Sequence, residues 1–365
     1  MRFPKEILIK RLNKFQSKIR EQNIDAVMIR TQSSYIYFTG IKWLRPALLI
    51  PSEGEPIAFI AFGEEEGFIE RTWIRNILTF KEGGELIAQV TGTIRQNGYK
   101  TIGMEFGIER DAYILFYEMF KRLNRNVKIV DVSPLLSEMR MLKDRYELSF
   151  IRRAGKIVSN TMEKALGLID VGVSETEIAA EIYKILYSLG SEEPKVYVNA
   201  GPYPRIHSEP FRDSKVEKES FVSIIIGGDY NGYYANMART VFVGEPRDIS
   251  LDALKCIEEV YNLAFEMTTS NTKFIDVMKA LDKVYSKYNL LDYRVVGYSH
   301  GVGLQIEEMP ITTILPKHRF MRVKPGMVLA FVHAPIMLKN YGQVKKEDTF
   351  IIKEDGGLEA VTCLN

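Results

Sequence analysis

The segment Tyr298-Ser-His-Gly-Val-Gly-Leu-Gln-Ile-Glu-Glu-Met-Pro310 carries the strongest chemical signal in the sequence. Two glycines follow His300 at positions 301 and 303, and Glu307, Glu308 and a proline close the segment. Glycines beside a histidine let the backbone approach closely and can hold the imidazole ring over a cavity. A surface loop has no need of this pattern, so we expect His300 to line a functional site.

Length and composition describe an ordinary globular chain with room for two or three domains. Of its 365 residues, 46% are hydrophobic and 26% are charged. Lysine and arginine number 49 against 47 aspartates and glutamates, so the net charge of +2 gives no bulk attraction to nucleic acid or to an anionic membrane. The first residues lack a signal-peptide pattern, and no window approaches eighteen consecutive apolar residues. We expect a cytoplasmic protein that binds neither nucleic acid nor membrane.

The first third of the chain alternates helical and strand patterns. Leu8, Leu12, Phe15 and Ile19 recur at helical spacing. Further helices are predicted over 85–97 and 110–123, and strands over 24–29, 47–50, 57–60, 101–105 and 127–132. Such alternation predicts an α/β domain. We place it at residues 1–133, because Pro134 interrupts the last strand.

Residues 134–365 combine long helices with strands of a second domain. Ser174 and Glu177 form a capping box at the start of one helix. An apolar stripe predicts a helix around 151–158, and two more helices are predicted over 250–269 and 274–288. Strands are predicted over 220–226, 233–242, 295–297, 327–333 and 349–352.

The segment 298–310 resembles the H-G-x-G-L-x-x-H-E-x-P motif of peptidase family M24, which holds prolidase, aminopeptidase P, methionine aminopeptidase and creatinase. Glu307 stands where that motif has its second histidine. The resemblance covers nearly the whole chain in the same order. It implies an N-terminal α/β domain of the creatinase/prolidase kind over 1–133, followed by a pita-bread domain over 134–365, a curved antiparallel sheet covered by helices. It also implies a homodimer.

The family binds two divalent metals with two aspartates, a histidine and two glutamates, because paired metals need bridging carboxylates to offset their charge. The stretch Ile225–Thr240 resembles the family's aspartate motif, with its glycines, Tyr233 and Arg239 fixing the register. This alignment places Ile225 and Asn236 at the two aspartate positions. Neither residue supplies a carboxylate.

The other three ligand positions are mixed. His300 keeps the histidine, and Glu347 keeps the last glutamate. The remaining glutamate position falls on Val332 or on His333, depending on the direction of counting. Three of five ligands have therefore changed, and we expect no two-metal peptidase chemistry and no metal cofactor. If His333 fills the position, then His300, His333 and Glu347 form a two-histidine, one-carboxylate set that suits one divalent metal.

The remaining polar residues still form a candidate pocket. His207, in a stretch that resembles the family's P-H-x-x-P loop, is a candidate catalytic residue together with His300, Glu308 and Glu347. The candidate substrate-binding residues are Glu307, Arg239, Lys345 and Asn236. His318 lies between Lys317 and Arg319 and is predicted to be solvated surface.

Four functions stay open from the sequence. The pocket could bind or hydrolyse a small peptide- or amide-like molecule without metal, or it could be a single-metal hydrolase site. The chain could instead be a non-catalytic dimeric binding protein. The fourth hypothesis is that the chain is a weak Xaa-Pro dipeptidase or aminopeptidase, the activity that the family resemblance implies.

Overall fold

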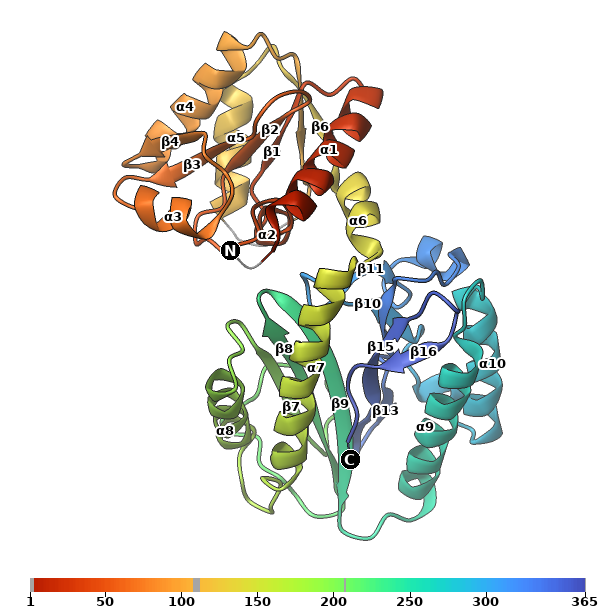
Figure 1. Cartoon of the computed structure of the whole chain (residues 1–365). Helices are drawn as coiled ribbons and strands as arrows, with labels where there is room; N and C mark the ends of the chain where they lie inside the picture. Colours follow the sequence, from red (N-terminus) through yellow and green to blue (C-terminus); the bar gives the residue numbers. More distant parts are fainter. Residues whose placement is uncertain (1–2, 108–111, 207, 365) are drawn as a thin grey trace. The chain divides into compact units, whose positions relative to one another are not determined.

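The computed structural model describes residues 3–107, 112–206 and 208–364, which form two compact units (Figure 1). The units are Met1–Met139 and Arg140–Asn365. This division falls inside a helix, α6 (Ser133–Met141). The boundary predicted between residues 133 and 134 coincides with the start of α6 and remains a prediction.

The first unit is built on a mixed six-stranded sheet. Its strands are β1 (Ala26–Ile29), β2 (Leu48–Pro51), β3 (Ile57–Ala61), β4 (Ile77–Phe80), β5 (Thr101–Met104) and β6 (Lys128–Asp131). They lie in the order β4-β3-β2-β1-β5-β6. β1, β5 and β6 run parallel, whereas β1, β2 and β3 pair antiparallel. The prediction of an α/β domain is confirmed.

Helices pack on this sheet through their apolar stripes. They are α1 (Lys5–Glu21), α2 (Gln32–Thr39), α3 (Glu65–Arg71), α4 (Gly83–Gln96) and α5 (Ala112–Leu123). Leu8, Leu12, Phe15 and Ile19 of α1 are all buried, as their helical spacing predicts. α4 and α5 contribute Val90, Ile94, Phe116 and Phe120 to a core shared with the strands.

The second unit is an antiparallel sheet of eight strands. Its strands are β7 (Lys195–Ala200), β8 (Ser220–Tyr230), β9 (Tyr233–Val243), β10 (Ser299–Gly301), β11 (Glu308–Ile311), β12 (Val328–Phe331), β15 (Glu347–Ile352) and β16 (Leu358–Ala360). They lie in the order β11-β10-β12-β15-β9-β8-β7, with β16 paired to β15. A separate hairpin joins β13 (Ile336–Leu338) and β14 (Gly342–Val344).

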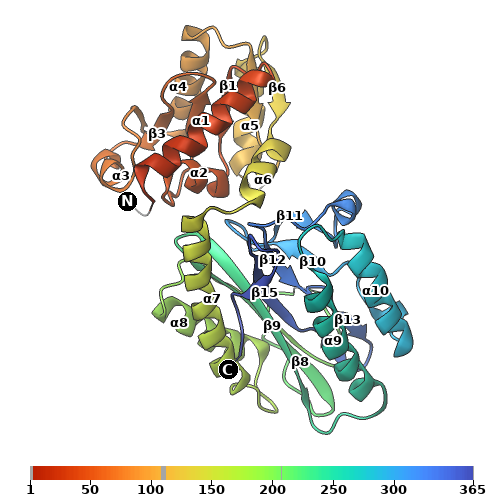
Figure 2. The same ribbon diagram turned by 45° about the vertical axis from the view of Figure 1, so that its right-hand side comes forward.

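Four long helices accompany this sheet: α7 (Arg145–Leu166), α8 (Glu175–Ser188), α9 (Asp248–Met267) and α10 (Phe274–Lys287) (Figure 2). The capping box of Ser174 and Glu177 is present at the start of α8, as predicted. A second capping box, of Asp144 and Glu147, begins α7. A pita-bread sheet covered by helices is therefore confirmed. No helix within the described ranges has the length and apolar character needed to cross a membrane.

All four helices lie on the same face of the sheet, as the strand register shows. A Cβ added at Gly228 would lie 2.7 Å from Val158 Cγ2 of α7, so α7 covers the face of β8 that carries residues 226 and 228. The paired residues that continue this face across the sheet are Ile226, Met237, Asp348 and Phe331. Phe331 belongs to the core beneath α9 and α10. We call the opposite side of the sheet the site face.

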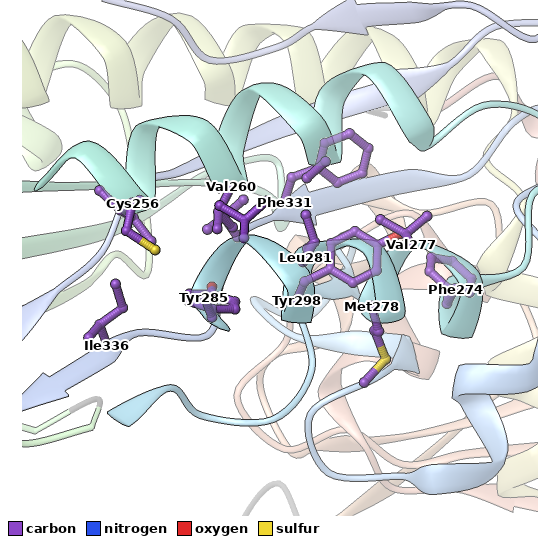
Figure 3. Packing of buried hydrophobic residues seen from close by; sticks show 14 of the residues in the cluster. Cys256, Val260, Phe274, Val277, Met278, Leu281, Tyr285, Tyr298, Phe331 and Ile336 are labelled. Atoms are coloured by element: carbon purple, nitrogen blue, oxygen red, sulfur yellow. The ribbon is translucent and has the colours of Figure 1, made fainter. Parts of the chain in front are cut away.

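The core beneath α9 and α10 is apolar and continuous (Figure 3). It joins Cys256 and Val260 of α9 to Phe274, Val277, Leu281 and Tyr285 of α10, and also to Tyr298 and Phe331. The strand predicted over 295–297 is wrong, because Gly297 has φ of 106° and the strand begins at Ser299. Residues in β-strands have negative φ angles, so a residue with a positive φ angle interrupts the strand.

The residues after β16 close against α7. A Cβ added at Gly155 would lie 2.2 Å from the carbonyl oxygen of Val361. Val361 N donates to Thr349 O over 2.8 Å, which ties the same residue to β15. Gly155 thus permits a contact that any larger residue would obstruct.

We predict that Gly155→Ala lowers the free energy of unfolding by about 1–3 kcal/mol, because overpacking at this contact forces backbone shifts. Gly92→Ala in α4 is the matched control, since nothing lies within 4 Å of the added Cβ. It should stabilise by roughly 0.5–1 kcal/mol through helix propensity. Urea unfolding followed by circular dichroism measures both, and an unchanged midpoint for Gly155→Ala would contradict the prediction.

Candidate functional site

The candidate ligand positions lie together on the site face because of strand register. Glu347 pairs with Ala238, and Ala238 with Ile225. His300 pairs with Ala330, and Ala330 with Thr349, two residues from Glu347. Side chains alternate between faces along a strand, so His300 and Glu347 project from the same side.

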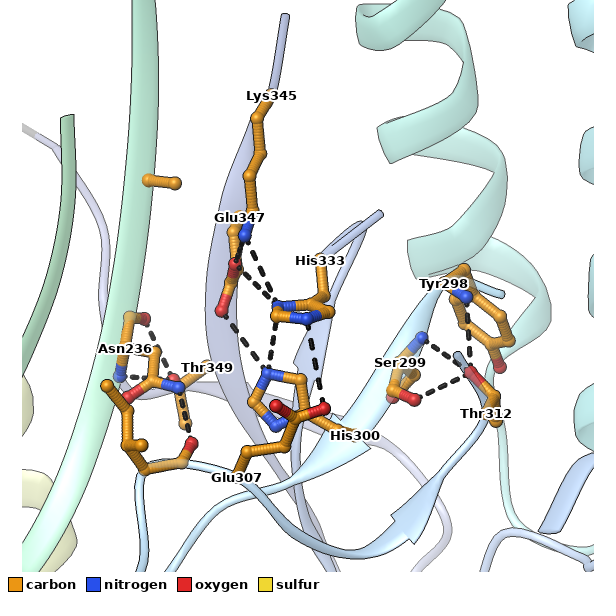
Figure 4. Close-up of polar contacts among 12 residues, drawn as sticks. Asn236, Tyr298, Ser299, His300, Glu307, Thr312, His333, Lys345, Glu347 and Thr349 are labelled. Carbon is orange, nitrogen blue, oxygen red and sulfur yellow. Dashed lines mark hydrogen bonds and ion pairs between the residues drawn. The ribbon is translucent and has the colours of Figure 1, made fainter. Parts of the chain in front are cut away.

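Three of these side chains form a compact cluster of ligand-type atoms (Figure 4). One nitrogen or oxygen atom from each of His300, His333 and Glu347 lies within 4.8 Å of the others. His300 Nε2 lies 3.1 Å from His333 Nδ1 and 3.6 Å from Glu347 Oε1. His333 Nδ1 lies 3.3 Å from Glu347 Oε2. The three side chains are buried.

The backbone decides which residue after β12 enters this cluster. Val332 has φ of 59°, in the left-handed region that β-branched residues avoid. The Val332 side chain belongs to the apolar core, while the imidazole of His333 faces Glu347. The ambiguity of the sequence is therefore resolved in favour of His333.

A fourth group, the ammonium of Lys345, occupies the same space. Its Nζ lies 2.6 Å from Glu347 Oε2 and 3.3 Å from His333 Nδ1. The Lys345 side chain is only 1% exposed. A buried ammonium and a buried carboxylate at this distance form a strong ion pair, in which each charge offsets the burial of the other.

The hydrogen-bond partners assign the proton of one of the two histidines. His333 Nδ1 faces both the ammonium of Lys345, which can only donate, and the carboxylate of Glu347, which can only accept, so either neutral tautomer of His333 satisfies one of these partners. Gly301 O lies 2.9 Å from His300 Nδ1 and can only accept, so that nitrogen carries hydrogen. His300 Nε2 therefore faces His333 and Glu347.

Burial and the surrounding charges shift the pKa of each group. Burial, then the positive charge of Lys345, hold the pKa of His333 well below its ordinary value. Burial alone would raise the pKa of Glu347, but Lys345 and His333 outweigh it and hold that pKa well below its ordinary value. Burial alone would lower the pKa of His300, but the hydrogen bond and the negative charge of Glu347 outweigh it and raise that pKa. The cluster thus favours a neutral His333 beside an ionised Glu347.

Glu307 and Asn236 flank the cluster. Glu307 Oε1 lies 3.8 Å from His333 Nε2, and this side chain is 25% exposed. Asn236 is buried and its Nδ2 donates to Ile306 O over 2.7 Å. Since that carbonyl can only accept, Asn236 Oδ1 points away from it. Oδ1 has no hydrogen-bond partner within the described residues.

Glu308 is engaged elsewhere, although it adjoins Glu307. Its carboxylate lies 2.8 Å from Arg140 Nη2 and 2.7 Å from Lys143 Nζ. Burial would raise the pKa of Glu308, but Lys143 and then Arg140 outweigh it and lower that pKa. Sequence reasoning missed Arg140 and Lys143, since no local pattern links them to a carboxylate more than 160 residues away.

The other candidates are dispersed. Arg239 pairs with Asp348 at 2.8 Å, on the helix-covered side of β15. His318 was predicted to be solvated surface, and this is wrong: it is buried, and its Nδ1 accepts from Ile311 N over 2.9 Å. Its basic neighbours in sequence misled the prediction. His207 lies outside the described residues, and its catalytic role stays a prediction.

Comparison with known families identifies the class to which this fold and site belong. Residues 11–142 match the creatinase/prolidase N-terminal domain, and residues 149–354 match metallopeptidase family M24. Together they define a two-domain protein of the prolidase type. Because the second match covers more than half of the chain, the chain belongs to metallopeptidase family M24.

Individual relatives match along nearly their whole length. The Xaa-Pro dipeptidase of Pyrococcus furiosus is 24% identical over 95% of this chain and 96% of its own. The uncharacterized peptidase YqhT of Bacillus subtilis is 23% identical over 95% of this chain and 96% of its own. The crystal structure of the prolidase from Pyrococcus horikoshii OT3 gives a TM-score of 0.85 at 22% identity, over 98% of this chain and 99% of that one. At this identity the superposition supports the fold.

We predict that Glu308→Ala lowers the free energy of unfolding by about 3–5 kcal/mol, because two buried cations lose their shared partner. Glu359→Ala is the control. It removes a partly exposed pair with Arg152 and should cost only about 0–1 kcal/mol. Urea unfolding at neutral pH measures both, and equal losses would contradict the prediction.

The same variant should change the response to acid. The folded-state pKa of Glu308 is lowered, so its stabilisation is complete above the unfolded pKa of about 4.3 and is lost as pH falls through the folded value. Glu308→Ala should therefore lose less stability than the wild type as pH is lowered below about 4.3. Parallel acid dependence of the two proteins would refute this role.

Proposed function

We propose that this chain binds, or hydrolyses, a small peptide- or amide-like molecule at the cluster of His300, His333, Glu347 and Lys345, without a dinuclear metal centre. The observation that carries the proposal is the position of Lys345 Nζ, 2.6 Å from Glu347 Oε2 and 3.3 Å from His333 Nδ1. A metal bound by the same two atoms would lie about 2 Å from each. The ammonium and a metal ion therefore compete for one place.

The donor set argues against a pair of metals. Two adjacent metal ions require bridging carboxylates to reduce their mutual repulsion. Ile225 offers hydrocarbon and Asn236 a neutral amide oxygen at the positions that the family resemblance gives to aspartates. In the cluster itself, Glu347 is the one carboxylate, and it already holds Lys345.

The accessible edge of the cluster suits an amide group. His333 Nε2 lies 3.8 Å from the carboxylate of Glu307, which is 25% exposed. The charge of Lys345 beside Nδ1 favours the tautomer of His333 that carries hydrogen on Nε2. An amide presents a C=O acceptor beside an N–H donor, and it can accept from that hydrogen while donating to Glu307. The relatives named Xaa-Pro dipeptidase support a peptide-like ligand.

A single divalent metal is the second candidate, and the cluster of His300, His333 and Glu347 favours it. His300 fits a ligand role, because Nδ1 donates to Gly301 O and leaves Nε2 directed at the cluster. When bound, such a metal would supply Lewis-acid chemistry to an amide carbonyl. It would need the ammonium of Lys345 to move away.

We predict that Lys345→Met binds one divalent metal per chain, whereas the wild type binds none after dialysis. The substitution leaves Glu347 buried without its cation, which should destabilise the metal-free variant by about 3–5 kcal/mol. Added zinc should then restore the thermal midpoint. Plasma mass spectrometry after incubation with cobalt, manganese, zinc or iron(II) measures the stoichiometry.

Lys346→Met is the matched control, since the Lys346 ammonium pairs with Glu258 at the surface. It should behave as the wild type. About two metals per wild-type chain would refute the proposal and restore two-metal peptidase chemistry. About one would favour the single-metal candidate.

A direct assay of the family's reaction tests the same proposal. We expect Xaa-Pro dipeptides incubated with the wild type and manganese or cobalt to show no cleavage that a chelator abolishes. The release of free proline measures this outcome. Robust release of proline that is lost on addition of a chelator would refute the proposal.

The predicted role of His207 has its own test. If small-molecule screening finds turnover, His207→Ala should abolish it, because the family resemblance places this residue facing the substrate, where it would serve as acid or base without a metal. Unchanged turnover would remove His207 from the site. If neither turnover nor binding of a small molecule is found, the dimeric binding protein becomes the better reading, and light scattering would test the expected homodimer.

A further inference from the structure

The first unit contains a cavity of about 390 Å³ that the proposed function does not use. It lies where α4 and α5 end and β5 and β6 begin. Arg95 is in the last turn of α4, Lys100 directly precedes β5, Arg122 is in the last turn of α5, and Arg125 lies in the turn before β6. The volume lies in the range of ~300–1,000 Å³ that is usual for small-molecule sites.

The charge of this cavity is one-sided. Four of its lining residues are cations and none is acidic. None of the four forms an ion pair with another of the described residues. Asp25 lies near Tyr99 in the lining, but its Oδ2 already accepts from the backbone N–H groups of Lys100 and Thr101, over 2.7 and 2.8 Å.

Helix ends account for only part of this arrangement. The C-terminal end of a helix is electronegative and attracts cations, which suits Arg95 and Arg122. Arg95 Nη2 indeed donates to Leu123 O over 2.8 Å. Lys100 and Arg125 lie outside the helices, so the helix dipoles do not require them. Their convergence on the same cavity needs another explanation.

We propose that this cavity binds a small phosphorylated molecule. Guanidinium groups present paired N–H donors that match the oxygens of a phosphate, and a lysine adds a point charge. One N–H group of the Arg95 guanidinium donates to Leu123 O, and its other N–H groups can donate to a ligand. The cavity has room for an organic group beside the phosphate. The site would be separate from the cluster around Lys345 and independent of the function proposed for it.

Isothermal titration calorimetry of the full-length chain at low salt tests this proposal. The probes are ribose 5-phosphate, ribose and pyrophosphate. We expect saturable binding of ribose 5-phosphate and none of ribose. If pyrophosphate binds and ribose 5-phosphate does not, the cavity is a site for inorganic anions. That result would overturn the proposal that it binds a small phosphorylated molecule.

Arg122→Ala/Arg125→Ala should weaken ribose 5-phosphate binding at least tenfold. Lys10→Ala/Lys14→Ala is the matched control, because it removes two exposed positive charges from α1 of the same unit. The control should change the affinity less than twofold. An equal loss in both variants would show non-specific charge attraction and overturn the proposal, as would the absence of binding by the wild type.

Arg122→Lys/Arg125→Lys guards against an effect on folding. It keeps both charges and removes the paired donors, so we expect affinity between those of the wild type and the alanine variant, with an unchanged thermal midpoint. Wild-type affinity in this variant would show that charge alone suffices and would overturn recognition by guanidinium groups.

Discussion

The ion pair between Lys345 and Glu347 is the interaction on which the site depends. A carboxylate buried without a partner costs several kcal/mol, and the sheet leaves Glu347 almost no exposure to water. Lys345 stands two residues earlier, and side chains two apart in extended backbone point to the same side. The chain thus provides the compensating cation next to the charge that needs it. Through Nδ1, the imidazole of His333 contacts both members of this pair.

The same solution recurs at other buried carboxylates of the second unit. Glu308 is held by Arg140 and Lys143, Glu175 by Arg205, and Asp348 by Arg239. In each of these three cases, an arginine or lysine side chain supplies the positive charge that compensates the buried carboxylate. The second unit of this family member therefore balances these buried negative charges with side chains of its own.

The resemblance to the family predicted the two domains, the helical cover of the sheet and the grouping of His300 with Glu347, because the family's motifs occur in this chain in the same order. It could not choose between Val332 and His333, since the choice depends on one backbone angle at Val332. It assigned Lys345 to substrate binding and gave no sign of its contact with His333. The partners of Glu308 were not predicted either, because ion pairs between residues far apart in the sequence produce no local pattern.

The contact between Gly155 and Val361 has a consequence for synthesis. The first helix of the second unit packs against residues that leave the ribosome some 200 positions later, and Thr362 also bonds to Asp348 and to the backbone of Thr349. The strands of the first unit, by contrast, pair within residues 26–131. During translation the first unit can therefore acquire its core early, while the second waits for its last strand and the residues beyond it. For that interval the apolar residues of its sheet stay partly uncovered, a state that is prone to aggregation.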